Sequence, residues 1–241
     1  GKFQFSFFRI QTHNKFKKLI CEFAVKIMNY KSALNNTIFE VISRASQELN
    51  IESYVIGGFV RDLLLQRGTK KDIDVVAVGS GIELALKVSE LLPKKPKVQV
   101  FKTYGTAMLR FEDTDIEFVG ARKESYNHDS RNPIVENGTL QDDQNRRDFT
   151  INALALSLNP SNFGELLDPF AGISDLESKT IKTPLDPDIT FSDDPLRMLR
   201  GIRFATQLGF KIHPESLASI TKNAERIKII SGERIVEELN K

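Results

Sequence analysis

Residues 54–78 constrain the fold of this chain more than any other stretch, because they place two predicted strands on either side of a Gly-Gly turn. The apolar runs 54–56 and 73–78 have the composition of strands, and the second begins beside Asp72 and Asp74. Side chains two apart in a strand share a face. The two carboxylates therefore point the same way and can hold one hard cation between them.

Two alternatives stay open for this stretch when it is taken alone. The acids can be exposed strand residues that face Lys70 and Lys71 rather than a metal. The turn at Gly57 and Gly58 can be only a turn, or it can bring backbone N–H groups at a helix start close to an anion. In the second case Arg61 would add a charged fork for phosphate oxygens.

A third carboxylate favours the metal hypothesis. Glu117 lies on the predicted strand 116–119, where its apolar neighbours face the other way. Three carboxylates on adjacent strands suit a phosphoryl-transfer site in which two Mg²⁺ ions, about 4 Å apart, hold the attacking and leaving oxygens. Taken alone, Glu117 would be a strand residue facing solvent.

The rest of the chain divides into predicted helices, strands and one long polar segment. Apolar residues at spacings of three and four predict a helix over 33–49. A second helix is predicted over 81–92, ended by Pro93. Three further strands are predicted, and the polar residues 122–145 that follow them are expected to form a long loop or flap. The three strands are 98–101, 107–111 and 116–119.

The segment 194–208 predicts a helix with two different sides. At about 100° per residue, one side carries Asp194, Arg197, Arg200 and Arg203. The other side carries apolar residues, which are expected to pack: Met198, Leu199, Ile202 and Ala205. An aspartate acceptor beside an arginine fork can match the polar edge of cytosine or adenine. The alternative role for Asp194 is a helix N-cap next to Pro195.

Composition sets the limits of these interpretations. A chain of 241 residues that is 40% hydrophobic can bury a core and divide into a larger and a smaller unit. The net charge of +2 does not select a class of partner. Cys21 is the only cysteine, which excludes an intrachain disulfide and indicates a reducing, cytoplasmic location. No apolar run approaches the roughly 20 residues of a membrane span, so no membrane partner is expected.

Four segments together resemble the class II branch of the tRNA nucleotidyltransferase and bacterial poly(A) polymerase superfamily. They are GGFVRD, DID, RRDFTINALAL (146–156) and DDPLRMLRGIRFATQLGF (193–210), in the order that the family has them. The resemblance covers about residues 55–238. Where the family usually has Glu, this chain has Asp193.

The resemblance implies roles for particular residues. Asp72, Asp74 and Glu117 match the catalytic, metal-binding carboxylates, which implies two Mg²⁺ ions as cofactors. Gly57 and Gly58 with Arg61 match positions that hold the nucleotide triphosphate, as does Arg147. Asp194 and Arg197 match the pair that reads the incoming base, while Arg200 and Arg203 match further nucleotide-contacting arginines. For Arg146, contact with an RNA phosphate and a structural ion pair both remain open.

These observations predict an α/β (α+β) nucleotidyltransferase head with a small mixed sheet, followed by an all-helical neck. The head is expected over 28–158, and the neck, ending before the family's further helices, over 159–241. Residues 1–27 form a basic extension that is either foreign to the natural protein or a genuine N-terminal helix, with Met28 as the candidate start.

The predicted function is template-independent addition of CCA to the 3′ end of tRNA from CTP and ATP, in which the RNA 3′-hydroxyl attacks the α-phosphate. A poly(A) polymerase is less favoured, because residues 101–111 read FKTYGTAMLRF where such enzymes often have a basic GRRF-like segment. An enzyme adding only CC or only A would share every motif. A non-catalytic RNA-binding module would be expected to lose a carboxylate, and a small-molecule nucleotidyltransferase would not need the base-reading helix. The sequence sets no oligomeric state.

Overall fold

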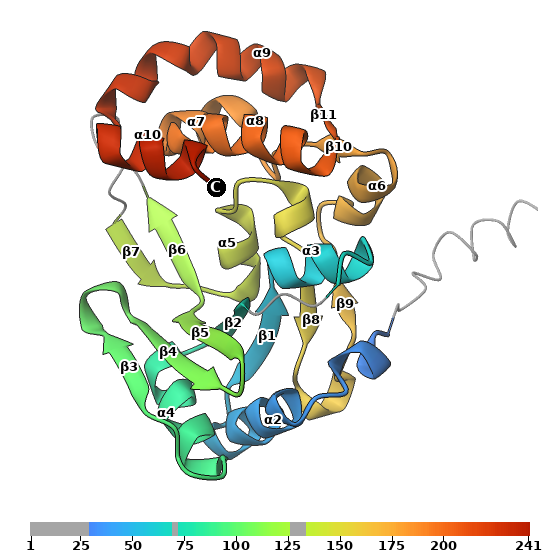
Figure 1. The fold of residues 1–241 in the computed structure, drawn as a ribbon, viewed down its shortest axis with the longest axis vertical. Helices are drawn as coiled ribbons and strands as arrows, with labels where there is room; N and C mark the ends of the chain where they lie inside the picture. Colours follow the sequence, from blue (N-terminus) through green and yellow to red (C-terminus); the bar gives the residue numbers. More distant parts are fainter. Residues whose placement is uncertain (1–28, 69–71, 126–133) are drawn as a thin grey trace, which may run out of the picture.

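The computed structural model describes residues 29–68, 72–125 and 134–241. The extension 1–27 and the lysines Lys70 and Lys71 therefore lie outside the described residues. In Figure 1 the chain forms a sheet-based head below and a helical region above. No helix of the described residues is long and apolar enough to cross a membrane.

The head is built on a mixed sheet of seven strands, in the order β3-β4-β5-β2-β1-β8-β9. Strands β2 and β5 are parallel, and the other neighbouring pairs are antiparallel. The mixed sheet predicted from the sequence is confirmed. In chain order the strands are β1 (Glu52–Ile56), β2 (Asp72–Val78), β3 (Val98–Phe101), β4 (Thr106–Phe111), β5 (Thr114–Gly120), β8 (Ala155–Ser157) and β9 (Leu166–Leu167).

Two helices cover one face of this sheet. Helices α2 (Thr37–Leu49) and α4 (Gly81–Leu91) pack against each other and against the strands, as Figure 1 shows. Their apolar faces join one core with alternate residues of β2 and β5, such as Val75 and Phe118. Because strand side chains alternate, Asp74 and Glu117 project from the opposite face. The helix layer thus leaves that face available for a site.

The predicted helix 33–49 is interrupted near its start. A 3₁₀ turn over Lys31–Leu34 precedes α2, and the Asn36 side chain accepts a hydrogen bond from the Ile38 backbone N–H at 3.1 Å. Asparagine is a strong N-cap because its oxygen satisfies a helix donor that would otherwise lack a partner. The helix therefore begins four residues later than the apolar spacing suggested.

The prediction of a long loop over 122–145 is wrong. This segment contains a two-stranded sheet of β6 (Arg122–Ser125) and β7 (Ile134–Asn137), followed by α5 (Leu140–Asn145). Helix α5 begins with a reciprocal capping box, in which Thr139 and Asp142 bond each other's backbone N–H. The low hydrophobicity misled the prediction, because a flanking ribbon and a short capped helix need little apolar surface.

The C-terminal region is mainly helical and closes over the head. It also contains a short parallel pair of strands, so the expectation of helices alone does not hold in full. Strand β9 extends the head sheet past residue 158. The elements of this region are α6 (Gly172–Glu177), β10 (Thr180–Ile181), α7 (Pro187–Asp193), α8 (Leu196–Leu208), β11 (Lys211–Ile212), α9 (Pro214–Asn223), a 3₁₀ segment (Ala224–Ile229) and α10 (Gly232–Leu239).

Helix α8 buries only part of the side predicted to pack. Met198 is buried and Ala205 packs against the core, as predicted, but Ile202 is 49% exposed. Arg197, Gly201 and Phe204 are buried instead. The reason lies in the head: a Cβ on Gly201 would stand 3.1 Å from Cζ of Phe149. A residue without a side chain lets the helix approach Phe149 closely, so the arginine-bearing side, rather than the Ile202 side, faces the head.

Candidate active site

Two carboxylates lie side by side on the uncovered face of the sheet. Asp74 on β2 is the register partner of Glu117 on β5, and both are half-buried. Directly opposed residues on neighbouring strands have Cβ atoms about 5 Å apart. Burial, and then the charge of Asp74, raise the pKa of Glu117 above its ordinary value. A cation between the two groups would relieve both effects. We call this pair the carboxylate wall.

Asp72 shares this face but stands apart from the pair. Its register partner is Asp115, its residue is exposed, and it does not line the cavity described below. In the described part of the chain, no group of three His, Cys, Asp or Glu residues is gathered closely enough to hold a metal ion. The donor set of Asp74 and Glu117 nevertheless fits a hard cation such as Mg²⁺, which prefers carboxylate oxygens.

The Gly57 turn brings backbone close to the carboxylate wall. Gly57 has a φ of 82°, in the region that favours glycine, as expected for this turn. A Cβ at this position would stand 3.2 Å from Nη1 of Arg147 and 3.4 Å from Oδ2 of Asp74. Gly58 follows as the first residue of α3 (Gly58–Leu64). The turn therefore lies between a carboxylate and a guanidinium.

Arg147 is held in place by a buried acid. Its Nε and Nη2 donate to Oδ2 of Asp143 at 3.1 and 3.0 Å. Asp143 also accepts from Arg146, which lies 3.3 Å from a carboxylate oxygen of Glu124. Burial alone would raise the pKa of Asp143, but the charges of Arg147 and Arg146 outweigh it and lower that pKa. The structure therefore places Arg146 in an ion pair, one of the two roles left open for it.

The opposite wall of the site comes from the start of α8. Asp194 has extended backbone between α7 and α8, and its Oδ1 accepts from the Leu196 N–H at 3.2 Å. It thus has the capping contact suggested by the sequence while its side chain also lines the cavity. Arg197 is buried, and its Nη1 donates to the Thr190 carbonyl at 3.3 Å.

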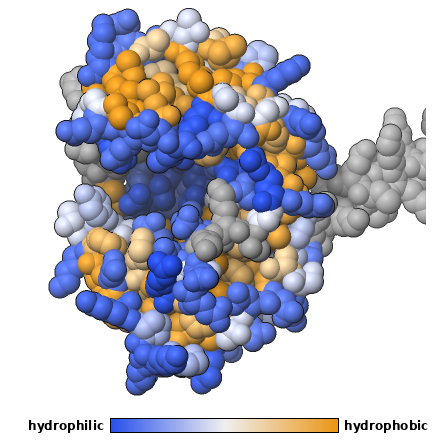
Figure 2. Space-filling view, viewed as in Figure 1, coloured by the Kyte–Doolittle hydropathy of each residue, from blue (hydrophilic) through white to orange (hydrophobic). Residues whose placement is uncertain are grey.

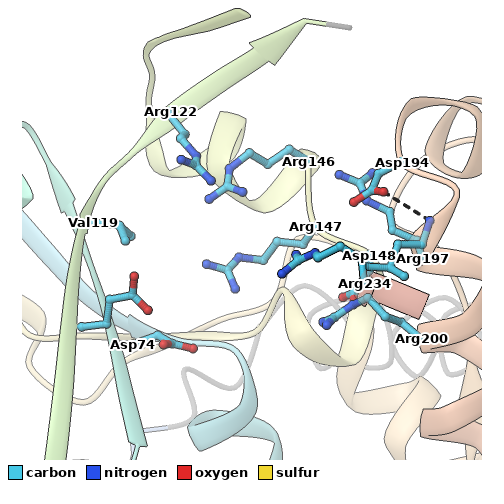
Figure 3. Close-up of a pocket in the computed structure, with 12 residues that line it drawn as sticks. Asp74, Val119, Arg122, Arg146, Arg147, Asp148, Asp194, Arg197, Arg200 and Arg234 are labelled. Atoms are coloured by element: carbon cyan, nitrogen blue, oxygen red, sulfur yellow. Dashed lines mark hydrogen bonds and ion pairs between the residues drawn. The ribbon is translucent and has the colours of Figure 1, made fainter. Parts of the chain in front are cut away.

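A cavity of about 350 Å³ lies between these two walls. Figure 2 shows the corresponding hollow as hydrophilic, and in Figure 3 the Arg147 guanidinium points from the α5 side toward Asp74. Six arginines and four acids line it, so positive charge predominates. The lining residues are Asp74, Glu117, Val119, Arg122, Arg146, Arg147, Asp148, Asp194, Leu196, Arg197, Arg200 and Arg234.

Two lining arginines had not been singled out from the sequence. Arg122 follows β5 and projects into the same space as Glu117, whose pKa it lowers in part. Its position on β6, directly after the strand of the third carboxylate, is a signal that could have indicated it. Arg234 is on α10, far along the chain from every motif, and its proximity depends on how α10 packs on α8.

Two of the predicted nucleotide-binding arginines lie outside the cavity lining. Arg61 is buried, donates to both carboxylate oxygens of Asp62 at 2.8 and 3.1 Å, and donates to Oδ1 of Asn152 at 2.8 Å. Arg203 donates to Oε1 of Glu238 at 2.5 Å and lies over the Phe204 ring. In this structure both arginines hold elements together.

Arg200 lines the cavity but is paired. Its Nε and Nη2 lie 2.8 and 2.7 Å from Oδ2 of Asp148, while Oδ1 of Asp148 accepts from Phe149 and Asn152. Beside this pair, Phe149 meets Phe204 edge to face with ring centroids 6.0 Å apart. We call these contacts between Asp148, Phe149, Arg200 and Phe204 the head–neck seam. Asp148 and Asn152 thus support the connection between head and helical region.

Two family models match the chain. The model described as the poly A polymerase head domain matches residues 53–182, which is more than half of the chain. The model described as a probable RNA and SrmB-binding site of polymerase A matches residues 209–241. The head match contains the carboxylate wall, the Gly57 turn and Arg147.

Curated relatives are similar over most of this chain. The A-adding tRNA nucleotidyltransferase of Aquifex aeolicus is 38% identical over 191 residues, which cover 78% of this chain and 23% of that protein. The CCA-adding enzyme of Enterococcus faecalis is 38% identical over 208 residues, covering 84% of this chain and 48% of that enzyme. The chain thus spans about a quarter and about half, respectively, of these two relatives.

Solved structures show the same fold. A CCA-adding enzyme in its apo form II aligns with a TM-score of 0.77 at 33% identity, covering 91% of this chain and 51% of that one. A tRNA nucleotidyltransferase complexed with a primer tRNA and an incoming ATP analog aligns with a TM-score of 0.71, also at 33% identity, covering 83% of this chain and 55% of that one. The α/β head followed by a helical region is thereby confirmed.

Proposed function

Because this chain belongs to the class II tRNA nucleotidyltransferase and poly(A) polymerase head family, we propose that it is the catalytic and nucleotide-selecting part of an enzyme that adds CCA to the 3′ end of tRNA from CTP and ATP. One observation carries the proposal: the carboxylate wall faces, across one cavity, the helix start that presents Asp194 and Arg197. A site of this kind joins phosphoryl transfer to base selection. An enzyme of this kind would act in the reducing environment of the cytoplasm.

Phosphoryl transfer needs positioning and charge compensation more than covalent chemistry. In the reaction, a bond forms between the RNA 3′-oxygen and the α-phosphorus, and the bond from that phosphorus to the bridging oxygen of pyrophosphate breaks. Asp74 and Glu117 would hold Mg²⁺, and Asp72, on the same strand face but apart from this pair, would complete the set of three carboxylates. When bound, the metal supplies charge neutralisation at the phosphates and polarisation of the 3′-hydroxyl.

Arginine side chains would bind the triphosphate. Arg147, which follows α5, points toward the carboxylate wall, and Asp143 on α5 fixes its orientation. Gly57 leaves room beside it for close approach of the ligand. A planar guanidinium matches phosphate oxygens in a bidentate manner. Arg147 can therefore orient the leaving pyrophosphate, while the carboxylate wall would hold the metal ion that neutralises charge at the reacting phosphate.

Base selection would come from Asp194 and Arg197. The carboxylate can accept from the exocyclic amino group that cytosine and adenine share, and the guanidinium can donate to a ring acceptor. A wrong base would present a polar edge that does not match these two groups, and in a partly buried site such a mismatch makes discrimination steep. No nucleic-acid template is needed.

Addition of A alone is the second candidate function. It is favoured by the similarity to the Aquifex A-adding enzyme, which is as high as that to the Enterococcus CCA-adding enzyme. The carboxylate wall, the Gly57 turn and the base-reading pair would serve either activity.

One assay tests both candidates. The protein, extended as in its longer relatives, is incubated with Mg²⁺, labelled CTP or ATP, and tRNAs that end before the CCA, after the first C, or after CC. CCA addition predicts that C enters the first two and A enters the third. Incorporation of A into the third alone would identify the A-adding activity, and long adenosine tails on unrelated RNA would identify a poly(A) polymerase. No incorporation into any of them would contradict the proposal.

The base-reading role has a separate readout. Asp194→Ala is expected to reduce discrimination among the four nucleotides more than it slows metal-dependent transfer. Asp186→Ala, which alters a helix cap on α7 away from the cavity, is the matched control. Uniform slowing with unchanged selectivity would contradict the assigned role.

A further inference from the structure

An aromatic tip on the β3–β4 hairpin lies beside the active-site cavity and has no role in the site described above. The tip consists of Phe101, Lys102, Thr103 and Tyr104. Tyr104 is 73% exposed and Phe101 is 42% exposed, although aromatic rings are normally buried in a folded chain. Phe101 is the last residue of β3 and Tyr104 belongs to the 3₁₀ turn that follows, and neither is part of the buried core of the head.

Strand register places Phe101 on the same face as the carboxylate wall. Phe101 is opposite Thr106 on β4, and Thr106 is opposite Val119 on β5, which lines the cavity. Directly opposed residues in a sheet share a face, and Val119 shares its face with Glu117 because they are two apart. Phe101 therefore lies in the row of Val119, two strand spacings or about 10 Å away.

The charge and the surface around the tip are suited to a polyanion. Lys102 is the charged residue of the tip, and the segment 98–111 contains no acid; its other cation, Arg110, lies at the far end of β4 and pairs with Asp115. Figure 2 shows hydrophobic surface gathered beside the hydrophilic hollow, over the β3–β4 end of the head. Exposed aromatic faces next to cations are the combination that binds single-stranded nucleic acid, because every base can stack on a ring while the phosphates meet positive charge.

We propose that the aromatic tip is a stacking platform for the RNA primer, with Tyr104 and Phe101 contacting bases next to the 3′ end and Lys102 contacting a phosphate. The proposal rests on the proposed function, since the tip lies on the face of the carboxylate wall and within reach of an RNA whose 3′-hydroxyl is at Glu117. It adds a contact for RNA, on the head, that is separate from the nucleotide-binding residues.

The experiment measures RNA binding without nucleotide, so that no turnover is needed. The equilibrium constant for a fluorescently labelled tRNA that lacks its CCA end is obtained by anisotropy, with a 2-aminopurine in the last unpaired position as a stacking probe. Tyr104→Ala is expected to weaken binding about tenfold and to restore 2-aminopurine fluorescence, while Tyr104→Trp retains both affinity and quenching. Lys102→Ala is expected to reduce the salt dependence of binding by about one phosphate contact.

Leu86→Ala is the matched control, because Leu86 is 51% exposed on α4, on the helix-covered side of the sheet. Equal RNA affinities for Tyr104→Ala and Leu86→Ala would overturn the proposal. Tyr104-dependent dimerisation in light scattering, with no change in RNA affinity, would also overturn it and would identify a second copy of the chain as the occupant. Nucleotide affinity is expected to be unchanged in all these variants.

The two proposals fail in different ways. If Tyr104→Ala adds nucleotides normally at an unchanged KM for tRNA, the stacking platform is contradicted and the proposed function stands. If RNA binding depends on Tyr104 but the wild-type protein adds no nucleotide, the stacking platform stands and the proposed function is contradicted.

Discussion

The carboxylate wall and the head–neck seam contain the same kind of acidic side chain in opposite electrostatic settings. At the seam, burial by itself would raise the pKa of Asp148, but the charge and hydrogen bonds of Arg200, the hydrogen bond from Asn152 and the charge of Arg197 together lower it. At the wall, Glu117 is only half-buried, yet burial and the neighbouring Asp74 raise its pKa. An acid that has an arginine partner stabilises the fold, whereas two acids side by side form a donor set that fits a metal cation.

The comparison also distinguishes two sets of arginines. Arg147 and Arg197 lie at the cavity, whereas Arg61 and Arg203 are paired with Asp62 and Glu238 away from it. Replacing an acid should therefore have different consequences in the two regions. At the wall it should remove activity with little loss of stability, and at the seam it should remove stability first. The following predictions test this difference, from the largest expected effect to the smallest.

The largest effect is expected at the carboxylate wall. Asp74→Asn and Glu117→Gln should each reduce the single-turnover rate of nucleotide addition by about 10³-fold or more, since a metal contributes several kcal/mol to transition-state stabilisation. The melting temperature should stay equal or rise, because one of two adjacent like charges is removed. Asp115→Asn is the control, since Asp115 is on β5 like Glu117, pairs with Arg110 and does not line the cavity. A nearly normal rate for Asp74→Asn would end the metal-site interpretation.

The second effect is expected at the seam. Asp148→Ala should lower the free energy of unfolding by about 3–5 kcal/mol, because it leaves Arg200 without its buried partner. Asp148→Asn should cost less, since an amide oxygen can still accept from the Phe149 N–H. Chemical denaturation of both variants measures the difference. A loss below about 1 kcal/mol for Asp148→Ala would mean that the seam does not hold head and neck together.

A smaller effect is expected at the Gly57 turn. Gly57→Ala should cost about 1–2 kcal/mol, because a side chain is strained at a φ of 82°. It should also raise the KM for nucleotide, since the new Cβ would stand 3.2 Å from Nη1 of Arg147. Gly68→Ala is the matched control: its φ is 85°, and a Cβ there would meet nothing within 4 Å. If both variants raise the KM equally, the contact with Arg147 has no part in binding.

The smallest effect is a dependence on pH that has opposite signs in the two regions. The folded-state pKa of Asp148 lies below its ordinary value of 3.8, so the stabilisation is fully present above that value and is lost as the pH falls through the folded pKa. The stability advantage of the wild type over Asp148→Asn should therefore shrink on acidification below about pH 4.

The folded-state pKa of Glu117 is raised above 4.5, so ionisation of Glu117 costs stability as the pH rises. Glu117→Gln should then gain on the wild type between about pH 4 and neutrality. Denaturation curves at several pH values measure the difference in unfolding free energy between the wild type and each variant. If this difference changed with pH in the same direction for Asp148→Asn and Glu117→Gln, the comparison would be contradicted.

Much of the head could be predicted from local pattern. Alternation in 73–78 correctly gave a strand with Asp74 on one face, and the Gly57 turn has the positive φ expected of it. These features follow from period-2 alternation and from glycine's freedom, both of which depend on neighbours in the chain. The segment 122–145 failed because hydrophobicity is a weak signal for a flanking ribbon and a short capped helix.

The sequence by itself determined which residues can do chemistry here: two acids on one strand face, a third on another strand, and an Asp-Arg pair at a helix start. The tertiary structure decided which of them meet. Parallel pairing of β2 with β5 brings Glu117, rather than Asp72, beside Asp74, and close approach at Gly201 turns the arginine side of α8 toward the head. Arg61 and Arg147 look alike as motif residues, yet one is paired with Asp62 and Asn152 and the other points into the cavity. A side chain's partner depends on where segments far apart in the chain are packed, and local pattern does not contain that information.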